Sequence, residues 1–412
     1  MLAAILSLGL FYNGCGDVFR PVQTPVFQPG GDPQRQSHAL VVSSNGTNPG
    51  AAVIIDVSGD TNVATFSGLT HGMGQNPVYA INSGGINYVV DRDDDSVSSF
   101  ILPTPGFSSD LSRNIITLPA GARPVFAAAA QGKVFVADSG TNGVAVISGN
   151  SFFPPEIPVG ANPVALVATP DGTKLYCLNQ GDNTVSVIFP AINQNVKTIQ
   201  VGIGISPAWA AVSSDGSRVY VVNRGSSNIS VIDTTSDSVI MASNLIPVVI
   251  PVGAGPNYIF YQASQNRFYV TSPPDNSLSI IDNNVDPGQC ALTPSMCVQT
   301  RSLAGAPCNG QHATSVTGLA DGTRAYVADD ATNSVCVLNT TNNAFIKSIL
   351  VGTAPVFIAS DSDSTRVYTA NSGSSDVSII QTSTDTTVKR SDGITPLTIS
   401  ASGTPTFIAL TP

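Results

Sequence analysis

Three stretches of this chain share one pattern, KLYCLNQGDNTVSVI at 174–188, RVYVVNRGSSNISVID at 218–233 and RVYTANSGSSDVSII at 366–380. In each, an apolar strand led by an aromatic residue is followed by a polar loop and a second apolar strand. The aromatic residue precedes the start of the second strand by nine positions, as from Tyr176 to Val185. Because a hairpin loop of fixed length sets the register of its strands, this pattern predicts a repeated β-hairpin.

The same nine-residue spacing occurs in seven units of the chain. The pairs of aromatic residue and following strand are Tyr88 and Val97, Phe135 and Val144, Tyr176 and Val185, Tyr220 and Ile229, Tyr269 and Leu278, Tyr326 and Val335, and Tyr368 and Val377. An eighth copy, with a longer loop, runs from Ala39 to Val42 and then from Val53 to Asp56. Such repetition indicates an architecture in which neighbouring units bury each other's apolar faces.

Each unit is predicted to contain four antiparallel strands. A strand led by proline comes first, and an Asp-Gly pair then precedes the aromatic strand at 171–172, 215–216 and 321–322. Such a pair predicts a two-residue hairpin turn. The strands are apolar on both faces, as at 185–189, whereas a half-solvated sheet would alternate. The pattern therefore predicts an all-β propeller whose four-stranded blades pack face to face around an axis.

The number of blades follows from the residues that lead the first strands, namely Pro77, Pro124, Pro163, Pro207, Pro256, Ala313, Pro355 and Pro405. This count favours eight blades, and seven is the alternative if one unit is irregular. The first unit lacks a proline-led strand, while residues 404–410 supply one with no unit after it. We therefore expect the N- and C-terminal strands to pair in one blade and close the ring without a free sheet edge.

Composition excludes one class of partner. The chain has 412 residues, 27 acids against 17 bases, and a formal net charge of −10. A charge of this sign repels a phosphate backbone, so nucleic acid is not an expected partner.

The N-terminal segment predicts the cellular compartment. Residues 1–12 form an apolar run too short to span a bilayer, and Gly14 and Cys15 follow, as in a bacterial lipoprotein signal. We interpret 1–15 as a signal with lipidation at Cys15, 16–37 as a proline-rich tether and 38–412 as the propeller. Plain secretion and a buried N-terminal strand are the alternatives. The expected location is the cell envelope, with membrane contact only through an N-terminal lipid, or secretion to the periplasm or cell surface.

The repeated strand and loop pattern resembles the YVTN-type β-propeller repeat of bacterial and archaeal surface and periplasmic proteins. It is more distantly similar to lactonase-type propellers. The resemblance covers about residues 38–412 and implies that the proline-led strand is innermost. The loops that enter this strand and the loops that follow the aromatic strand would then share one face around the axis. The resemblance predicts fold far better than function, because propellers host enzymes, binders and scaffolds alike.

Polar residues end the aromatic strands on that expected face. Three positions after each aromatic residue stand Asp91, Asp138, Asn179, Asn223, Ser272, Asp329 and Asn371. We call these the strand-end residues. The favoured interpretation is that they cap the following loops by hydrogen bonding to the backbone, and the alternative is that they contact a ligand.

The densest charge run is Asp91-Arg92-Asp93-Asp94-Asp95. Carboxylates so close together could hold calcium, with Asp93, Asp94 and Asp95 as ligands. The run lacks the D-x-D-x-D-G order of a calcium loop, and Arg92 competes for the carboxylates, so a solvated loop is favoured. No other cofactor is predicted.

Other chemically active residues are sparse. His38, His71 and His312 form no metal-binding motif, and Trp209 is expected in the core. Besides Cys15, five cysteines remain. We expect Cys290 and Cys297 to form a disulfide, and Cys177 and Cys336, inside strands, to be free buried thiols.

These observations favour a non-catalytic binding or scaffold protein for protein or carbohydrate partners at the cell envelope. The alternative is a lactonase-like hydrolase with its site at the mouth of the axial channel. An enzyme predicts acids with shifted pKa values or a metal at that mouth, whereas a binder predicts a polar face without them.

Overall fold

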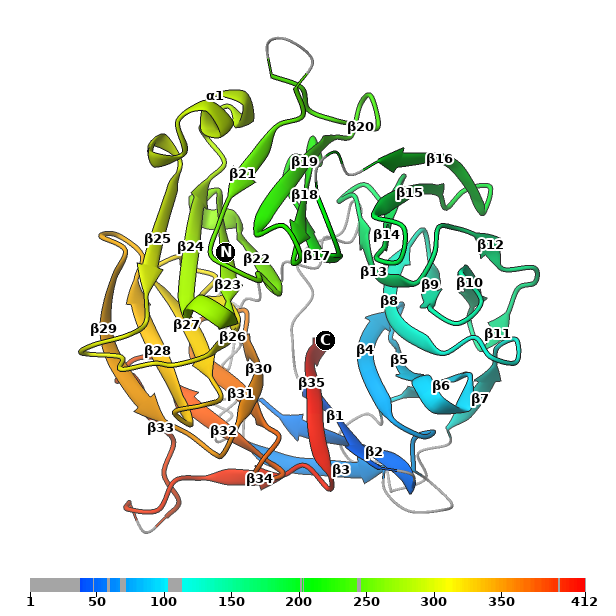
Figure 1. Cartoon of the computed structure of the whole chain (residues 1–412). Coiled ribbons are helices and arrows are strands. Elements are labelled where there is room, and N and C mark those ends of the chain that lie inside the picture. The colour runs from blue at the N-terminus through cyan, green and yellow to red at the C-terminus, as the bar shows by residue number, and fades with distance from the viewer. Residues whose placement is uncertain are drawn as a thin grey trace, which may run out of the picture.

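Eight sheets form a ring around a central axis (Figure 1). The computed structural model describes residues 38–411 except 47, 58–59, 67–71, 103–112, 201, 203, 243–245 and 392. Each sheet is antiparallel and forms one blade. The predicted eight-bladed, all-β propeller is therefore confirmed, and the seven-bladed alternative is not. The proposed lipidation site at Cys15 and the tether at 16–37 lie outside the described residues.

The blades share one order of strands, and they are numbered along the chain from the blade that contains β1. From blade 1 to blade 8 the innermost strands are β35 (Thr404–Thr411), β4 (Pro77–Ser83), β8 (Pro124–Ala130), β13 (Pro163–Ala168), β17 (Pro207–Val212), β22 (Tyr258–Gln262), β26 (Ala313–Gly318) and β30 (Pro355–Ser360). The second strands are β1 (His38–Asn45), β5 (Ile86–Asp91), β9 (Lys133–Asp138), β14 (Leu175–Asn179), β18 (Arg218–Asn223), β23 (Arg267–Ser272), β27 (Arg324–Asp329) and β31 (Arg366–Asn371).

The third strands are β2 (Asn48–Asp56), β6 (Ser96–Ile101), β10 (Gly143–Ser148), β15 (Thr184–Phe189), β19 (Asn228–Asp233), β24 (Ser277–Asp282), β28 (Ser334–Asn339) and β32 (Asp376–Gln381). The outer strands are β3 (Thr61–Phe66), β7 (Asn114–Thr117), β11 (Ser151–Phe152), β12 (Ile157–Pro158), β16 (Gln194–Gln200), β20 (Ser238–Val239), β21 (Val249–Pro251), β25 (Val298–Ser302), β29 (Ala344–Leu350), β33 (Thr386–Thr387) and β34 (Thr398–Ser400). The short helices are η1 (Arg92–Asp94), η2 (Ala263–Gln265), η3 (Pro273–Asp275), α1 (Pro287–Leu292) and η4 (Pro294–Met296).

The two ends of the described chain close the ring within blade 1. β35 is antiparallel to β1, with Val41 opposite Ile408 and Leu40 opposite Ala409. β35 also contacts the innermost strands of both neighbouring blades, β4 and β30. The expected pairing of the terminal strands is confirmed.

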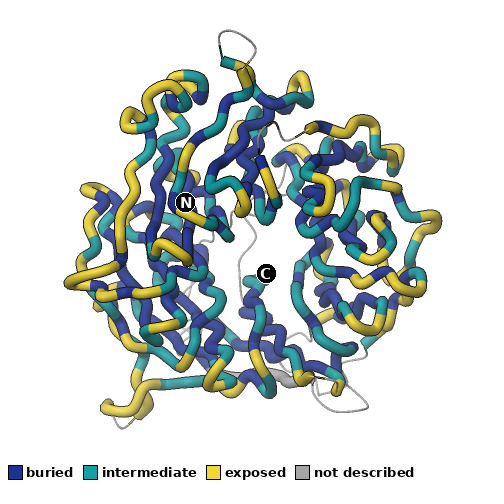
Figure 2. The backbone as a smooth tube through the Cα atoms, viewed as in Figure 1, coloured by how far each residue is buried: buried dark blue, intermediate teal, exposed yellow. Residues whose placement is uncertain are grey.

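The core lies between the blades, in their second and third strands (Figure 2). In β14 every residue is buried, and in β15 only Phe189 is not. Burial on both faces explains why these strands do not alternate between apolar and polar residues.

The Asp-Gly turns differ from the expected two-residue hairpins. In blade 4 the N–H of Gly172 donates to the carbonyl of Thr169. The first hydrogen bond across the two strands joins the N–H of Thr169 to the carbonyl of Lys174. Only the glycine has a positive φ, 65°. The loop is wider because the Asp171 carboxylate accepts bonds from the Thr173 N–H and the Thr169 hydroxyl, which stabilises a turn with glycine in its last position.

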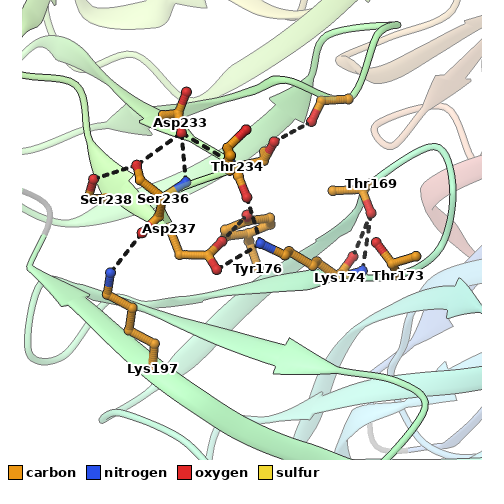
Figure 3. Close-up of polar contacts among 12 residues, drawn as sticks. Thr169, Thr173, Lys174, Tyr176, Lys197, Asp233, Thr234, Ser236, Asp237 and Ser238 are labelled. Carbon is orange, nitrogen blue, oxygen red and sulfur yellow. Dashed lines mark hydrogen bonds and ion pairs between the residues drawn. The ribbon is translucent and has the colours of Figure 1, made fainter.

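A side-chain clasp joins successive blades (Figure 3). The Tyr176 hydroxyl of blade 4 donates to Asp237 Oδ1 of blade 5 at 2.6 Å, and Lys174 Nζ lies 2.8 Å from Asp237 Oδ2. In the same way, the Asp385 carboxylate of blade 8 accepts hydrogen bonds from the Tyr326 hydroxyl and from Arg324 Nε of blade 7. The clasp recurs at the seam of the ring, where Tyr368 and Arg366 of blade 8 bond to Asp60 of blade 1.

The structure contains two disulfides within its described residues. Cys290 in α1 is joined to Cys297, the pair expected from sequence. Cys308 is joined to Cys336, so the expectation that Cys336 is a free thiol is wrong. The loop before β26 brings Cys308 over β28, with Cα atoms 5.4 Å apart, which is within the range that a disulfide spans. Cys177 remains a buried free thiol. No helix in the described part of the chain is long and apolar enough to cross a membrane.

Candidate functional site

The strand-end residues lie on the expected face of the ring. Asp91 pairs with Pro77 across the sheet, and Asn223 pairs with Pro207, so each second strand ends where an innermost strand begins. We call this side the loop face. All seven strand-end residues are 0% exposed, which places them beneath the loops of this face rather than on its surface.

The amides among them cap the adjacent loop and strand by bonding to side-chain hydroxyls, whereas the sequence predicts bonds to the loop backbone. Asn179 Nδ2 donates to the hydroxyls of Thr184 and Ser186, at 2.9 and 3.0 Å. Asn223 and Asn371 bond in the same way to Ser230 and Ser378, each seven residues further on.

The carboxylate of Asp329 has a different set of donors. It accepts bonds from the main-chain N–H groups of Gln311 and His312, before β26, and of Thr332, in the loop that follows. It therefore holds two loops of the loop face together. Ser272 is buried, and its hydroxyl has no hydrogen-bond partner among the described residues.

Glycines cover these caps, a signal that sequence reasoning missed. A Cβ built on Gly204 would lie 2.4 Å from the side-chain amide of Asn223, and one on Gly352 would lie 2.5 Å from that of Asn371. In both cases the glycine stands nineteen positions before the capped residue. The glycine that precedes these proline-led strands therefore marks a close approach of main chain to side chain.

Asp138 departs from this scheme. Seven residues after it stands Ala145, where the other blades with caps have serine, and neither carboxyl oxygen has a hydrogen-bond partner among the described residues. Burial raises the pKa of Asp138 to about 10, and the adjacent carboxyl of Glu156 contributes to the rise. Asp138 is therefore protonated in the folded protein at neutral pH.

The carboxylates of Asp93, Asp94 and Asp95 bond to three different partners rather than to a common one. Asp93 lies beside Arg92 and accepts a bond from Asn76, Asp94 accepts from the Gln75 N–H, and Asp95 accepts from the Gly121 N–H. No group of three His, Cys, Asp or Glu side chains suited to a metal occurs within the described ranges. Calcium binding by Asp93, Asp94 and Asp95 stays a prediction.

An aromatic collar surrounds the axis, and sequence reasoning did not predict it. Six aromatic side chains contact one another in a closed circuit, with centroid separations from 4.0 Å for Tyr79 and Phe126 to 5.6 Å for Tyr258 and Phe357. The remaining contacts join Phe126 to Trp209, Trp209 to Tyr258, Phe357 to Phe407, and Phe407 to Tyr79. Trp209 thus lies at the axis, and it also packs against the buried cores on both sides of its blade, as expected in part.

The sequence signal for the collar is an aromatic residue two positions after the residue that leads each innermost strand. That position holds Tyr79, Phe126, Trp209, Tyr258, Phe357 and Phe407 in six blades. The other two blades have small residues, Ala165 and Ser315, and the collar closes across both of them.

A bulge accompanies the collar in the proline-led strands. The sheet register shifts between Pro77 and Tyr79 and between Pro355 and Phe357. A bulge re-aims adjacent side chains, which lets two successive residues line the same space. That space is the axial cavity, of about 240 Å³, lined by Val78, Tyr79, Val125, Phe126, Val164, Trp209, Asn257, Tyr258, Thr314, Ser315, Val356, Phe357, Thr406 and Phe407.

The polar groups of the axial cavity are neutral. Burial raises the pKa of Tyr79 and of Tyr258 far above the ordinary value, so both phenols keep their protons. Ser315 is 2% exposed, and its hydroxyl has no partner among the described residues. No acidic or basic side chain belongs to the described lining.

A second pocket, of about 270 Å³, lies beside blade 2 and is called the side pocket. Its lining includes Met73, Gly74, Asp94, Ser98 and Arg113. Beneath it the Ser98 hydroxyl donates to Asp91 Oδ2 at 2.5 Å, and Arg113 lies 3.5 Å from the same hydroxyl. Burial raises the pKa of Asp91 to about 7, which leaves this carboxyl able to gain or lose a proton near neutrality.

Comparison with known proteins identifies the fold and no family. No protein-family profile matches the chain, and no curated protein matches it by sequence. Solved structures are similar over most of the chain. The periplasmic gluconolactonase PpgL of Pseudomonas aeruginosa has a TM-score of 0.57 at 15% identity, covering 91% of this chain and 99% of its own.

Two further structures are comparably similar. Apo AztD from Citrobacter koseri has a TM-score of 0.60 at 13% identity, covering 90% of this chain and 96% of its own. Hydrazine synthase from Kuenenia stuttgartiensis has a TM-score of 0.57 at 17% identity, covering 77% of this chain and 100% of its own. Identities this low show a shared propeller fold alone, so function must be argued from this chain's own site.

Proposed function

We propose that this chain is a non-catalytic binding protein of the cell envelope, with its binding site on the loop face at the axial cavity. The lining of that cavity carries the proposal, because its described side chains are aromatic, aliphatic or neutral and polar. Such a lining can contact a ligand, and it offers no general base or metal ligand for hydrolysis. Protein or carbohydrate partners suit this face.

An extracytoplasmic location fits this proposal. Two disulfides favour an oxidising compartment. The similar P. aeruginosa gluconolactonase is described as periplasmic. Lipidation at Cys15 and a YVTN-type repeat identity are part of the proposal, and mass spectrometry of the protein purified from membranes tests the lipid.

The test is a thermal-shift screen of the purified protein against cell-envelope glycans, monosaccharides and sugar lactones. A ligand that binds only the folded state raises its stability by about 2.7 kcal/mol at a hundredfold excess over Kd. We expect such a shift without chemical change of the ligand, and a smaller shift in Val356→Phe, which fills part of the cavity. A shift unaffected by Val356→Phe would place binding elsewhere.

The second candidate function is lactone hydrolysis in the side pocket. The observation in its favour is the carboxyl of Asp91, whose pKa of about 7 suits a general base, beside the cation of Arg113. In this reaction water adds to the lactone carbonyl, and Asp91 takes the water proton through Ser98. The ring C–O bond then breaks, and the departing alkoxide receives that proton. Arg113 would stabilise the oxyanion.

Glucono-lactone opening, followed in a pH-stat, distinguishes the two functions. Hydrolysis faster than the spontaneous rate and lost in both Asp91→Asn and Arg113→Gln would favour the enzyme. A rate equal to the spontaneous one would favour the binding protein.

A further inference from the structure

We propose that the axial cavity binds one neutral sugar ring, stacked on the aromatic collar and hydrogen-bonded to Ser315. This inference rests on the proposed binding function and names its ligand class. It follows from the cavity's size, its charge and the placement of its polar atoms.

Size limits the ligand to about one ring. The cavity volume of about 240 Å³ is below the roughly 300–1,000 Å³ of sites for drug-sized molecules. A single pyranose, or the terminal residue of a glycan, is therefore the largest carbohydrate unit that enters.

Charge limits the ligand to neutral molecules. No described lining residue is ionised, because the phenols of Tyr79 and Tyr258 stay protonated. An ion transferred from water into this lining would lose its hydration without gaining an opposite charge. The net charge of −10 adds repulsion toward anions.

The polar atoms indicate a ligand rich in hydroxyl groups. Ser315 Oγ is buried and unpartnered among the described residues, so a ligand hydroxyl can complete its hydrogen bonding. Thr314 and Thr406 donate their protons to main-chain carbonyls, which leaves both oxygens as acceptors. An entirely apolar ligand would leave Ser315 Oγ without a partner.

The aromatic collar supplies the other side of the contact. Sugar rings present C–H groups on their faces, and aromatic faces pack against such apolar surface. Ser315 occupies one of the two small-residue positions of the collar, next to Tyr258 of the preceding blade. Hydrogen-bonding and aromatic groups are therefore neighbours, as an amphipathic ring requires.

Trp209 provides the readout, because it is the only tryptophan of the chain and lines the cavity. The full chain is titrated with glucose, galactose, mannose and N-acetylglucosamine, with gluconate and glucosamine as charged controls and with indole as an apolar control. We expect a saturable change of Trp209 fluorescence with at least one neutral sugar and none with the charged controls. Methyl glycosides and cell-wall oligosaccharides with the same terminal sugar distinguish a free monosaccharide from a glycan end.

Variants locate the effect. Ser315→Ala removes the unpartnered hydroxyl and is expected to weaken binding about tenfold. Ser272→Ala is the matched control, because it removes another buried, unpartnered hydroxyl that does not line the cavity. We expect its affinity to equal that of the wild type.

Three results would overturn the inference. Saturation by charged sugars or by indole alone would refute the ligand class while leaving the axial site as a binding site. Equal weakening in Ser315→Ala and Ser272→Ala would refute the role of Ser315. No fluorescence change with any compound, together with a glycan thermal shift insensitive to Val356→Phe, would refute the axial site itself.

Discussion

The most unusual single residue is Asp138, a buried carboxyl where blades 4, 5 and 8 have an asparagine bonded to serine. Its Ala145 neighbour offers no hydroxyl, and Glu156 adds a second carboxyl close by. Protonation relieves both problems, because a neutral carboxyl is less costly to bury and can donate a hydrogen bond to Glu156. Asp329 shows the contrast, since donors from two loops satisfy its carboxylate.

Asp138 predicts a pH dependence of stability. The pKa of Asp138 rises from 3.8 in the unfolded chain to about 10 in the folded protein. The stability of the folded state is therefore highest below about pH 4, and it decreases as the pH rises from 4 through 10, because folding then requires Asp138 to take up a proton. Asp138→Asn should therefore raise the melting temperature relative to wild type more at pH 9 than at pH 5, measured by circular dichroism. Asp93→Asn is the control, because hydrogen bonds and Arg92 lower the pKa of Asp93, so that its carboxylate is ionised at both pH values and the substitution should have the same effect at pH 5 and pH 9. A parallel pH profile for Asp138→Asn and wild type would show that Asp138 is ionised.

Within an element, the cap beneath the loop face depends on glycine. Gly204→Ala places a methyl group 2.4 Å from the Asn223 amide, so the loop or the cap must move. We expect a loss of about 1–3 kcal/mol in the free energy of unfolding, as for other overpacked sites. Chemical denaturation measures it, and the double variant with Asn223→Ser should lose less than the sum of the two single variants. Strict additivity would mean that the two residues do not interact.

Between elements, the clasp residues join one blade to the next. Asp237→Ala leaves the Tyr176 hydroxyl without its acceptor and removes the counter-ion of Lys174, whose ammonium keeps only its bond to the Thr234 carbonyl. We expect unfolding to become easier by about 2 kcal/mol. The exposed Arg92–Asp93 pair is the control, and Arg92→Ala should change stability by less than about 1 kcal/mol. Equal effects of the two substitutions would show that the clasp adds no more than a surface ion pair.

For the whole molecule, the ring is closed by one strand. β35 pairs with β1, contacts β4 and β30, and supplies Phe407 to the collar. Ending the chain at 403 should expose the edge of β1 and open the collar, giving a broad, less cooperative thermal transition and self-association. Calorimetry and light scattering measure both effects. A synthetic peptide of residues 404–412, added in trans, should restore the sharp transition; a truncated chain that melts like the full chain would refute the role of β35.

The sequence alone determined the repeat, the strands and the closure of this propeller. The repeat and the strands depend on local spacing, such as the nine residues from Tyr176 to Val185. The closure depends on the two ends of the chain, because the first unit lacks a proline-led strand and the last residues supply one that has no unit after it. Tertiary structure alone decided which of these side chains meet. It closed the aromatic residues of six blades into one collar, paired Cys308 with Cys336, and left Ser315 and the Asp138 carboxyl without a hydrogen-bond partner among the described residues. The sequence places aromatic residues at one repeated position, but whether side chains of different strands or blades touch depends on how the blades pack, which the spacing within a unit does not contain.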